Sequence, residues 1–205
     1  MKLSRSLLPP LPPSISVYLA LKVVSVLGSA LAVPFALIYL HTVRGIPLDL
    51  AGVIWGSRII LTLVGSLVGG MWIDARGPAA GLLAGGALNA SGWIMLAFAT
   101  DATTAFTAAA LTGFGSGLMA DGVLLSRVVP REVRHAVFSL NFAAINFAFG
   151  IGAAIASFTA TASNPNSYTL LLIIAGASSL PATVYIQVVK RRVLPLDSHS
   201  VATPA

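Results

Sequence analysis

Three charged residues lie well inside long apolar stretches of this sequence: Lys22, Arg58 and Asp121. If these stretches cross a bilayer, each charge costs about 2.5 to 3.5 kcal/mol on insertion scales and should face protein or water. Lys22 and Asp121 lie at similar depths, counted at about 1.5 Å per helical residue from the same membrane side. We expect them to form an ion pair, either as a static bridge or as a site that binds a proton or a substrate.

Arg58 lies in the outer third of the second apolar stretch. Two interpretations stay open for its side chain. The guanidinium group could bind an anionic substrate, or the long side chain could extend to the outer membrane interface.

Enzymatic chemistry finds no support in the sequence. Ser116 lies in the run GFGSG, but a serine nucleophile needs a base within reach, and the three histidines fall in loops or the C-terminal tail. No apolar stretch carries two histidine or carboxylate ligands on one face, and the absence of cysteine excludes cysteine-ligated metals and disulfides. We therefore expect neither an enzyme nor a bound cofactor or metal, although Asp121 would allow proton coupling.

The composition requires a membrane to position these side chains. The chain is 57% hydrophobic and only 9% charged, with a mean hydropathy of +0.91. Soluble domains carry about 25% charged residues, so this chain is expected to have the lipid bilayer as its solvent. Runs long enough for a membrane helix predict an all-α integral membrane protein with six spans. The spans are 15–40, 50–73, 79–99, 104–129, 136–160 and 168–189.

The basic residues predict the orientation of these spans. The net charge of +6 would otherwise suggest nucleic acid as a partner, but the bases gather on one side of the membrane. That side holds Lys2, Arg5, Arg76, Arg127, Arg131, Arg134, Lys190, Arg191 and Arg192, and the other holds only Arg44. The positive-inside rule places the N-terminal segment 1–14 and the tail 190–205 in the cytoplasm. We predict a multi-pass protein of the cytoplasmic (inner) membrane.

Uncharged residues give further expectations for the bundle. Pro34 and Pro181 should kink the first and sixth spans. Asn141 and Asn146 should bond to neighbouring helices rather than to a ligand. Small residues recur at a spacing of four, which lets membrane helices pack closely. These pairs are Gly52/Gly56, Gly65/Gly69, Gly81/Gly85 and Gly113/Gly117.

The five-residue connection 74–78 between the second and third spans carries the most specific motif. Gly70, Asp74 and Gly77 have the spacing GxxxDxxG on the predicted cytoplasmic side, with Arg76 beside the second glycine. In this position the motif resembles the loop signature of the major facilitator superfamily of transporters. Segments in the first, fourth and fifth spans are similar to the N-terminal half of that family, so the resemblance covers about 17–189. It implies one six-helix half, built of two inverted three-helix repeats, with spans one and four beside the substrate path.

The sequence departs from the family pattern at several places. Ala75 stands where the family has an arginine, Pro78 and Ala79 replace bases, and Ala153 replaces the proline of the fifth-span Gly-Pro pair. Members usually have twelve spans, so the resemblance implies a second six-helix half, either another copy or a separate chain. It also implies that Asp74 acts as a latch against the partner's fifth span, near Arg131 and Arg134. The alternative is a solvated acid neutralised by Arg76.

The predicted function is therefore transport of a small solute as half of a secondary transporter, with exporter-like members as the more similar relatives. The alternative is a non-transporting scaffold or accessory protein, or a remnant of a twelve-helix transporter.

Overall fold

The computed structural model describes residues 11–119, 121–161 and 164–193, and every regular element in these ranges is helical. Six helical segments are long and apolar enough to cross a membrane, which confirms the predicted all-α, six-span fold. The segments are Pro13–Val43, Leu48–Arg76, Pro78–Ala97, Ala102–Val128, Arg131–Thr159 and Pro165–Lys190. Most of the two predicted cytoplasmic ends, with Lys2, Arg5 and His199, lies outside the described residues. The orientation stays a prediction.

The first span changes its helix type near its far end. α1 (Pro13–Ala32) is followed by the 3-10 turn η1 (Val33–Phe35), the short α2 (Ala36–Ile38) and the π-helical turn η2 (Tyr39–Val43). Pro34 lacks an N–H group and clashes with the preceding turn, so the regular α-helical ladder cannot continue through it. The sixth span is likewise divided into α8 (Pro165–Ser178) and α9 (Leu180–Val193) just before Pro181. Both proline positions thus disturb their helices, as predicted.

The second and third spans are joined more tightly than the sequence suggested. α3 (Leu48–Arg76) and α4 (Pro78–Ala97) are separated by Gly77 alone. Gly77 has φ of 80°, a conformation that glycine adopts far more easily than other residues. The predicted five-residue connection was wrong, because Asp74 and Arg76 belong to the last turn of α3. Pro78 takes the first helical position of α4, where its missing N–H costs nothing.

The fourth span is interrupted, whereas the sequence predicted one continuous helix over 104–129. α5 (Ala102–Leu118) ends before Met119, whose backbone is extended, and α6 begins at Asp121 (Asp121–Val128). The glycines of the GFGSG run weaken the helix before the break, and an aspartate is favoured in the first turn of the new helix. α7 (Arg131–Thr159) then forms the fifth span without interruption.

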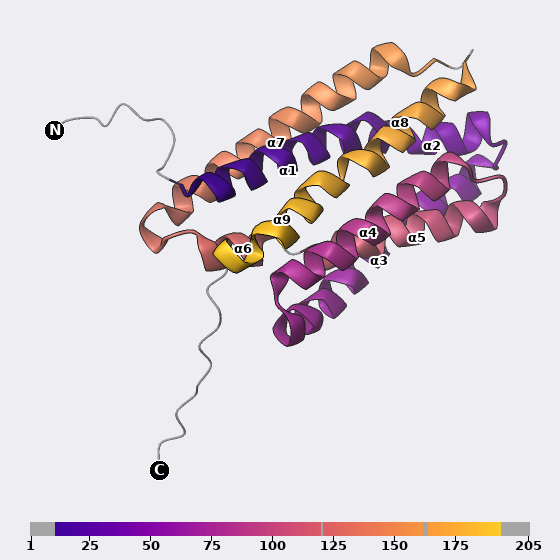
Figure 1. Ribbon diagram of the computed structural model, residues 1–205. Helices are drawn as coiled ribbons and strands as arrows, with labels where there is room; N and C mark the ends of the chain where they lie inside the picture. Colours follow the sequence, from indigo (N-terminus) through magenta and orange to yellow (C-terminus); the bar gives the residue numbers. More distant parts are fainter. Residues whose placement is uncertain (1–10, 120, 162–163, 194–205) are drawn as a thin grey trace.

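The helices pack in pairs that an internal two-fold relation would generate. α1 packs on α7 as α5 packs on α3, and α1 packs on α8 and α9 as α5 packs on α4. The two-fold relation exchanges the first span with the fourth, the second with the fifth and the third with the sixth. The contact of α4 with α8 and α9 joins the third span to the sixth, so this exchange converts it into itself. Each repeat contains three spans, an odd number, so the second repeat enters the membrane from the opposite side. This is the predicted arrangement of two inverted three-helix repeats (Figure 1).

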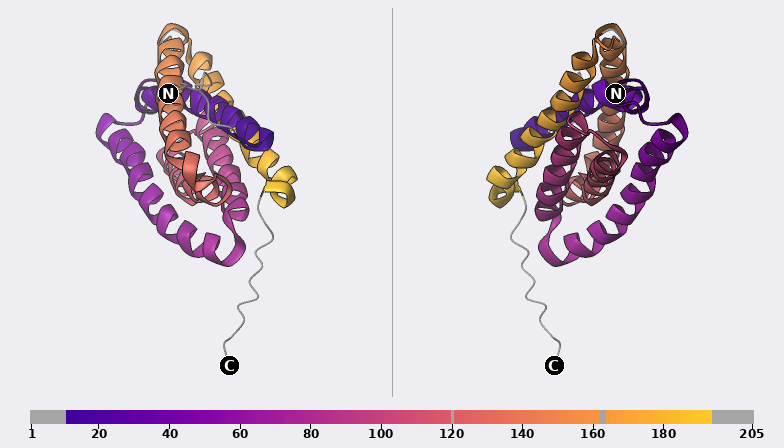
Figure 2. Two further views of the ribbon diagram at one scale, coloured as in Figure 1. Left: turned by 90° about the vertical axis from the view of Figure 1, so that its left-hand side faces the viewer. Right: turned by 90° about the vertical axis from the view of Figure 1, so that its right-hand side faces the viewer.

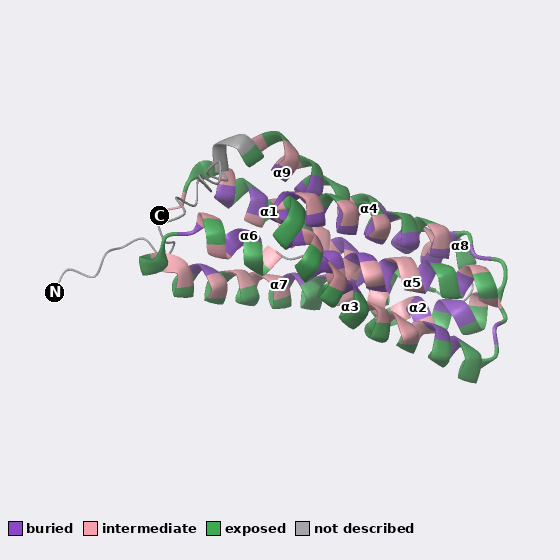
Figure 3. Cartoon of the chain, turned by 90° about the horizontal axis from the view of Figure 1, so that it is seen from below, coloured by how far each residue is buried: buried purple, intermediate pink, exposed green. Residues whose placement is uncertain are grey.

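The six spans form two layers. One row contains α3, α5 with α6, α1 and α7, and α4, α8 and α9 lie behind it. Figure 3 shows α3 and α7 along one edge of the molecule and α4, α8 and α9 along the opposite edge. Figure 2, which views the bundle from its two ends, shows α3 at its flank. We call the row of α3, α5, α6, α1 and α7 the front row.

Glycines explain how α3 approaches α5. A Cβ atom added at Gly65 would lie 2.3 Å from the Phe114 carbonyl oxygen, and one added at Gly113 would lie 2.3 Å from that of Arg58. The backbones are therefore in contact, as the small-residue pairs predicted. The pair Gly52/Gly56 is an exception, because nothing lies within 4 Å of an added Cβ at either position. These two glycines face outward on α3.

Candidate functional site

The two opposite charges of the first and fourth spans are in contact. The Lys22 ammonium forms an ion pair with Asp121, and the Tyr18 hydroxyl donates a hydrogen bond to the other carboxylate oxygen. It is the only ion pair in the part of the chain that the structure describes. The Lys22 and Asp121 side chains are 16% and 21% exposed, and Tyr18 is buried. The cluster joins α1 to the first residue of α6, directly after the break in the fourth span.

The sequence analysis predicted the pair but missed Tyr18. The available signal was its spacing, since residues four apart lie on one helix face and Tyr18 precedes Lys22 by four. Two donors and one carboxylate form a group without net charge, which makes the buried charges tolerable.

Arg58 lies inside the bundle, on the side of α3 that faces the back layer. Its guanidinium carbon is 5.3 Å from the ring centre of Trp55 and 5.8 Å from that of Trp93 on α4. Trp93 is fully buried, and the Arg58 Nε is buried without a hydrogen-bond partner. Stacking on indole rings stabilises a cation in a poorly hydrated site. The charge is therefore held among aromatic rings within the half-bundle.

The residues of the GxxxDxxG motif lie at one end of α3. Gly70 and Asp74 are four residues apart on the exposed face of this helix, and no atom lies within 4 Å of an added Cβ at Gly70. Arg76 does not pair with Asp74; its guanidinium stacks over the Trp72 ring at 4.4 Å. The Asp74 carboxylate is exposed at the same end of the bundle where α7 begins.

The two arginines expected to receive Asp74 differ in their surroundings. Arg134 is engaged within its own chain, because its Nη2 donates to the carbonyl oxygens of Ser126 at 2.5 Å and Val129 at 3.3 Å. It holds the turn between α6 and α7. Arg131, the first residue of α7, is exposed. Arg131 is thus the arginine of the two whose side chain faces outward.

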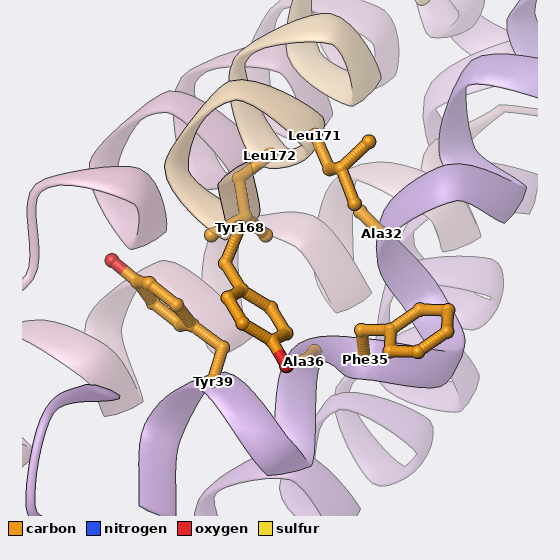
Figure 4. A pocket seen from close by; sticks show the side chains of 7 residues that line it. All are labelled: Ala32, Phe35, Ala36, Tyr39, Tyr168, Leu171 and Leu172. Carbon is orange, nitrogen blue, oxygen red and sulfur yellow. The ribbon is translucent and has the colours of Figure 1, made fainter. Parts of the chain in front are cut away.

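The opposite end of the bundle is closed by a polar cluster and an aromatic one. The Tyr39 hydroxyl donates to the Ala97 carbonyl oxygen at 2.8 Å, and Arg44 donates to that oxygen at 2.6 Å and to the Tyr39 hydroxyl at 2.7 Å. Beside them, Phe35, Tyr39 and Tyr168 lie around an apolar crevice too narrow for a water molecule (Figure 4). The end of the first span is therefore fixed to α4 and α8.

Uncharged polar side chains divide into packing groups and exposed groups. Asn89 on α4 donates to the Thr112 carbonyl oxygen at 3.1 Å and to the Ser116 hydroxyl at 2.8 Å, so Ser116 is a packing residue between α4 and α5. Asn146 does not reach a neighbouring helix, contrary to the sequence prediction. It is exposed, and its amide nitrogen donates to the Phe142 carbonyl oxygen of its own helix at 2.7 Å.

Two lines of exposed residues, one along α7 and one along α8 and α9, differ in chemistry, although α3 and the flanks of the α7 line expose large apolar residues. Along α8 and α9, the residues that recur at every third or fourth position and are exposed are almost all large and apolar. They are Leu170, Ile174, Ala177, Pro181, Val184 and Val188, and we call them the apolar stripe. Along α7 the corresponding exposed positions are all small or polar. They are His135, Ser139, Ala143, Asn146, Gly150, Ala154 and Ser157, and we call them the polar stripe.

The apolar stripe has the composition expected of a helix face in contact with lipid. The polar stripe does not, because small residues and residues such as Ser and Asn mark the faces where membrane helices meet other helices. Fewer residues are buried in α3 and α7 than in the sixth span: 17% of the most apolar 18-residue stretch in each of the two, against 44% for Pro165–Lys190.

Comparison with known protein families places the chain in its context. The model of the Major Facilitator Superfamily matches residues 19–204, almost the whole chain. No curated protein sequence matches the chain.

Proposed function

We propose that this chain, which belongs to the major facilitator superfamily of secondary transporters, carries a small solute across a membrane between its front row and a second six-helix half. The family membership points to a transporter rather than an enzyme. The observation that carries the proposal is the polar stripe on α7, an uninterrupted line of small and polar residues on the exposed side of the front row, where the apolar stripe on α8 and α9 is almost all large and apolar.

In this proposal, the second half covers the polar stripe of the front row. Polar groups exposed to lipid lose their hydrogen bonds with water, so a partner or a hydrated path should cover the polar stripe. Gly52, Gly56 and Gly70 on α3 leave room there for a close helix approach. Another copy of this chain can provide such a half, and we take it as the partner. An outward direction of transport, expected from the exporter-like resemblance, belongs to the same proposal.

The latch interpretation of Asp74 fits this arrangement. Asp74 and Arg131 are both exposed at one end of the front row, one at the end of α3 and the other at the start of α7. In a symmetric pair, Asp74 of one half would meet the first turn of α7 in the other half. A carboxylate is favoured there by the helix N-terminus and by the arginine. Arg134 is not needed for this contact, because it holds the α6–α7 turn.

We further propose that the cluster of Lys22, Asp121 and Tyr18 couples transport to protons. Protonation of Asp121 would remove its attraction to Lys22 and free α6, which lies beyond the break in the fourth span. Lys22 and Tyr18 would then serve as the groups that favour the ionised carboxylate. Arg58 is assigned to the stability of the half-bundle in this proposal.

Flux into proteoliposomes tests the transport proposal even before the solute is identified. Vesicles with the full chain are incubated in a mixture of small metabolites, and mass spectrometry identifies the solutes inside. Some solute should enter faster than into protein-free vesicles, and Asp74→Ala should slow its entry. If no solute enters faster although the chain is folded and paired, the non-transporting alternative holds instead.

A further inference from the structure

Asn146 combines three properties that a group for solute recognition needs. It lies at the midpoint of the 29-residue α7, it is exposed on the front row, and its amide is not used between helices. The single hydrogen bond of its nitrogen to Phe142 leaves one amide N–H and the amide oxygen without a partner among the described residues. Transporters of inverted-repeat architecture bind their solutes near the middle of the membrane.

The exposed surroundings of Asn146 are apolar. Gly150 follows one turn later, and no atom lies within 4 Å of an added Cβ there. Phe142 and Phe149 lie about one turn from Asn146 on the same side of the helix, and Phe147 is the next residue along the chain. Their exposed fractions are 70% for Phe142, 40% for Phe149 and 73% for Phe147. The amide is thus bordered by phenyl rings on both flanks and by a gap at the glycine. A flat apolar body fits such surroundings, with one polar group directed to the amide.

The charges of the front row indicate the charge of the solute. Lys22 and Asp121 neutralise each other, and Arg58 is directed toward Trp93 in the back layer. In the described residues, α7 carries no charged side chain after Arg134, and the unpaired guanidinium of Arg58 stacks on the rings of Trp55 and Trp93. An ion bound beside Asn146 would therefore lose part of its hydration without gaining a counter-charge, which is costly.

We propose that Asn146 determines specificity, and that the solute is an uncharged molecule with an aromatic or other flat apolar body and one hydrogen-bonding group. The proposal rests on the transport function proposed above and names its substrate class. The amide of Asn146 recognises the polar group, the phenylalanines contact the body, and Gly150 provides the space.

The absence of cysteine from the sequence gives a clean test. A Gly150→Cys variant carries its only thiol one turn from Asn146, and a Val184→Cys variant carries it on the apolar stripe. Both are treated in membrane vesicles with a charged, water-soluble methanethiosulfonate reagent. Because the reagent reacts only where water reaches, the Gly150→Cys thiol should react at least about tenfold faster. Equal rates would overturn the proposal, since position 150 would then lie against lipid or packed protein.

Two probes with the same rings test the substrate class. N-phenylnaphthylamine is neutral and has one N–H donor, and anilinonaphthalenesulfonate adds a sulfonate to the same skeleton. At equal membrane-bound concentrations, the neutral probe should slow labelling of the Gly150→Cys thiol several-fold and the sulfonate should not. Adding Asn146→Leu should abolish this protection, because a lost hydrogen bond weakens binding about tenfold. Adding Ser139→Ala, two turns away on the same stripe, should preserve it.

Protection by the sulfonate alone, no protection by either probe, or protection that survives Asn146→Leu would overturn the assignment. These results are separable from failure of the transport proposal. Flux of a charged solute into proteoliposomes with Asp74-dependent kinetics would leave transport standing and remove only the substrate class. Absence of any flux and of any paired half would remove the transport proposal by itself.

Discussion

Lys22 on α1 and Asp121 at the start of α6 form an ion pair that connects the two inverted repeats directly after the break in the fourth span. Met119, which follows α5, has an extended backbone, and side-chain contacts join α6 to its neighbours. The ion pair and the Tyr18 hydrogen bond supply such contacts on the α1 side, and Arg134 supplies them at the other end of α6.

Replacing one member of this pair should destabilise the protein. Asp121→Asn leaves the Lys22 ammonium without a counter-charge at a mostly buried place, at a cost of about 2 to 4 kcal/mol. Thermal unfolding in a mild detergent measures the loss. The double variant Lys22→Met with Asp121→Leu removes both charges and should recover most of the stability. A stable, active Asp121→Asn protein would show that the pair matters neither for folding nor for transport.

Tyr18→Phe should have a smaller effect in the same direction. It removes a hydroxyl that donates to a carboxylate and keeps the buried ring, so the expected loss is about 1 to 2 kcal/mol. The comparison is informative in the background of Asp121→Leu, where the hydroxyl has lost its acceptor. There the same change should cost clearly less, and an unchanged cost would mean that Tyr18 acts through packing alone.

Asp74→Ala should slow transport and leave the fold intact. The carboxylate is exposed at the end of α3 and makes no ion pair with Arg76, so little folding energy depends on it. Circular dichroism and thermal unfolding monitor the fold, and initial flux into proteoliposomes monitors transport. Arg131→Ala should resemble it. Flux at the wild-type rate in both variants would contradict the latch.

The close contact between α3 and α5 predicts that alanine substitutions at Gly113 and at Gly56 change the stability of the protein in opposite directions. Gly113→Ala places a methyl group 2.3 Å from the Arg58 carbonyl oxygen, so the helices must separate at a cost of about 1 to 3 kcal/mol. Gly56→Ala meets no atom and should gain up to about 1 kcal/mol from helix propensity. Unfolding in denaturant measures both variants. Equal effects would show that the backbone contact is absent.

The start of α5 predicts a dependence on pH. The backbone N–H of Thr104 donates to the Asp101 carboxylate and, as the largest cause, lowers its pKa below the ordinary value of 3.8; bonds from Thr100, Thr103 and the Thr104 side chain add to this. A lowered folded-state pKa stabilises the protein above the unfolded-state value, and this contribution is lost as the pH falls through the folded-state value. Asp101→Asn keeps a cap that does not titrate. The wild type should therefore lose more thermal stability than Asp101→Asn between neutral pH and pH of about 3, and parallel curves would exclude this contribution.

The number and order of the spans were predictable because they depend on runs of apolar residues, which the sequence states directly. The breaks were only partly predictable. Proline marks those of the first and sixth spans, but the break before Asp121 has no proline and depends on the glycines of α5 together with the contacts of α6. The direction of a side chain around its helix was harder still. Only the packing of α3 and α7 shows that the Arg58 side chain faces the back layer and that Asn146 lies on the exposed side of α7.

The measurement that tests the account most directly is disulfide cross-linking between two differently tagged copies of this cysteine-free chain in native membranes. One copy carries Leu67→Cys on the exposed face of α3, and the other carries Ala143→Cys on the polar stripe of α7. If the front rows of two halves face each other, mild oxidation should form a cross-linked dimer for this pair and not for Leu67→Cys with Val184→Cys on the apolar stripe. The absence of a dimer for the first pair, or equal yields for both pairs, would contradict the account.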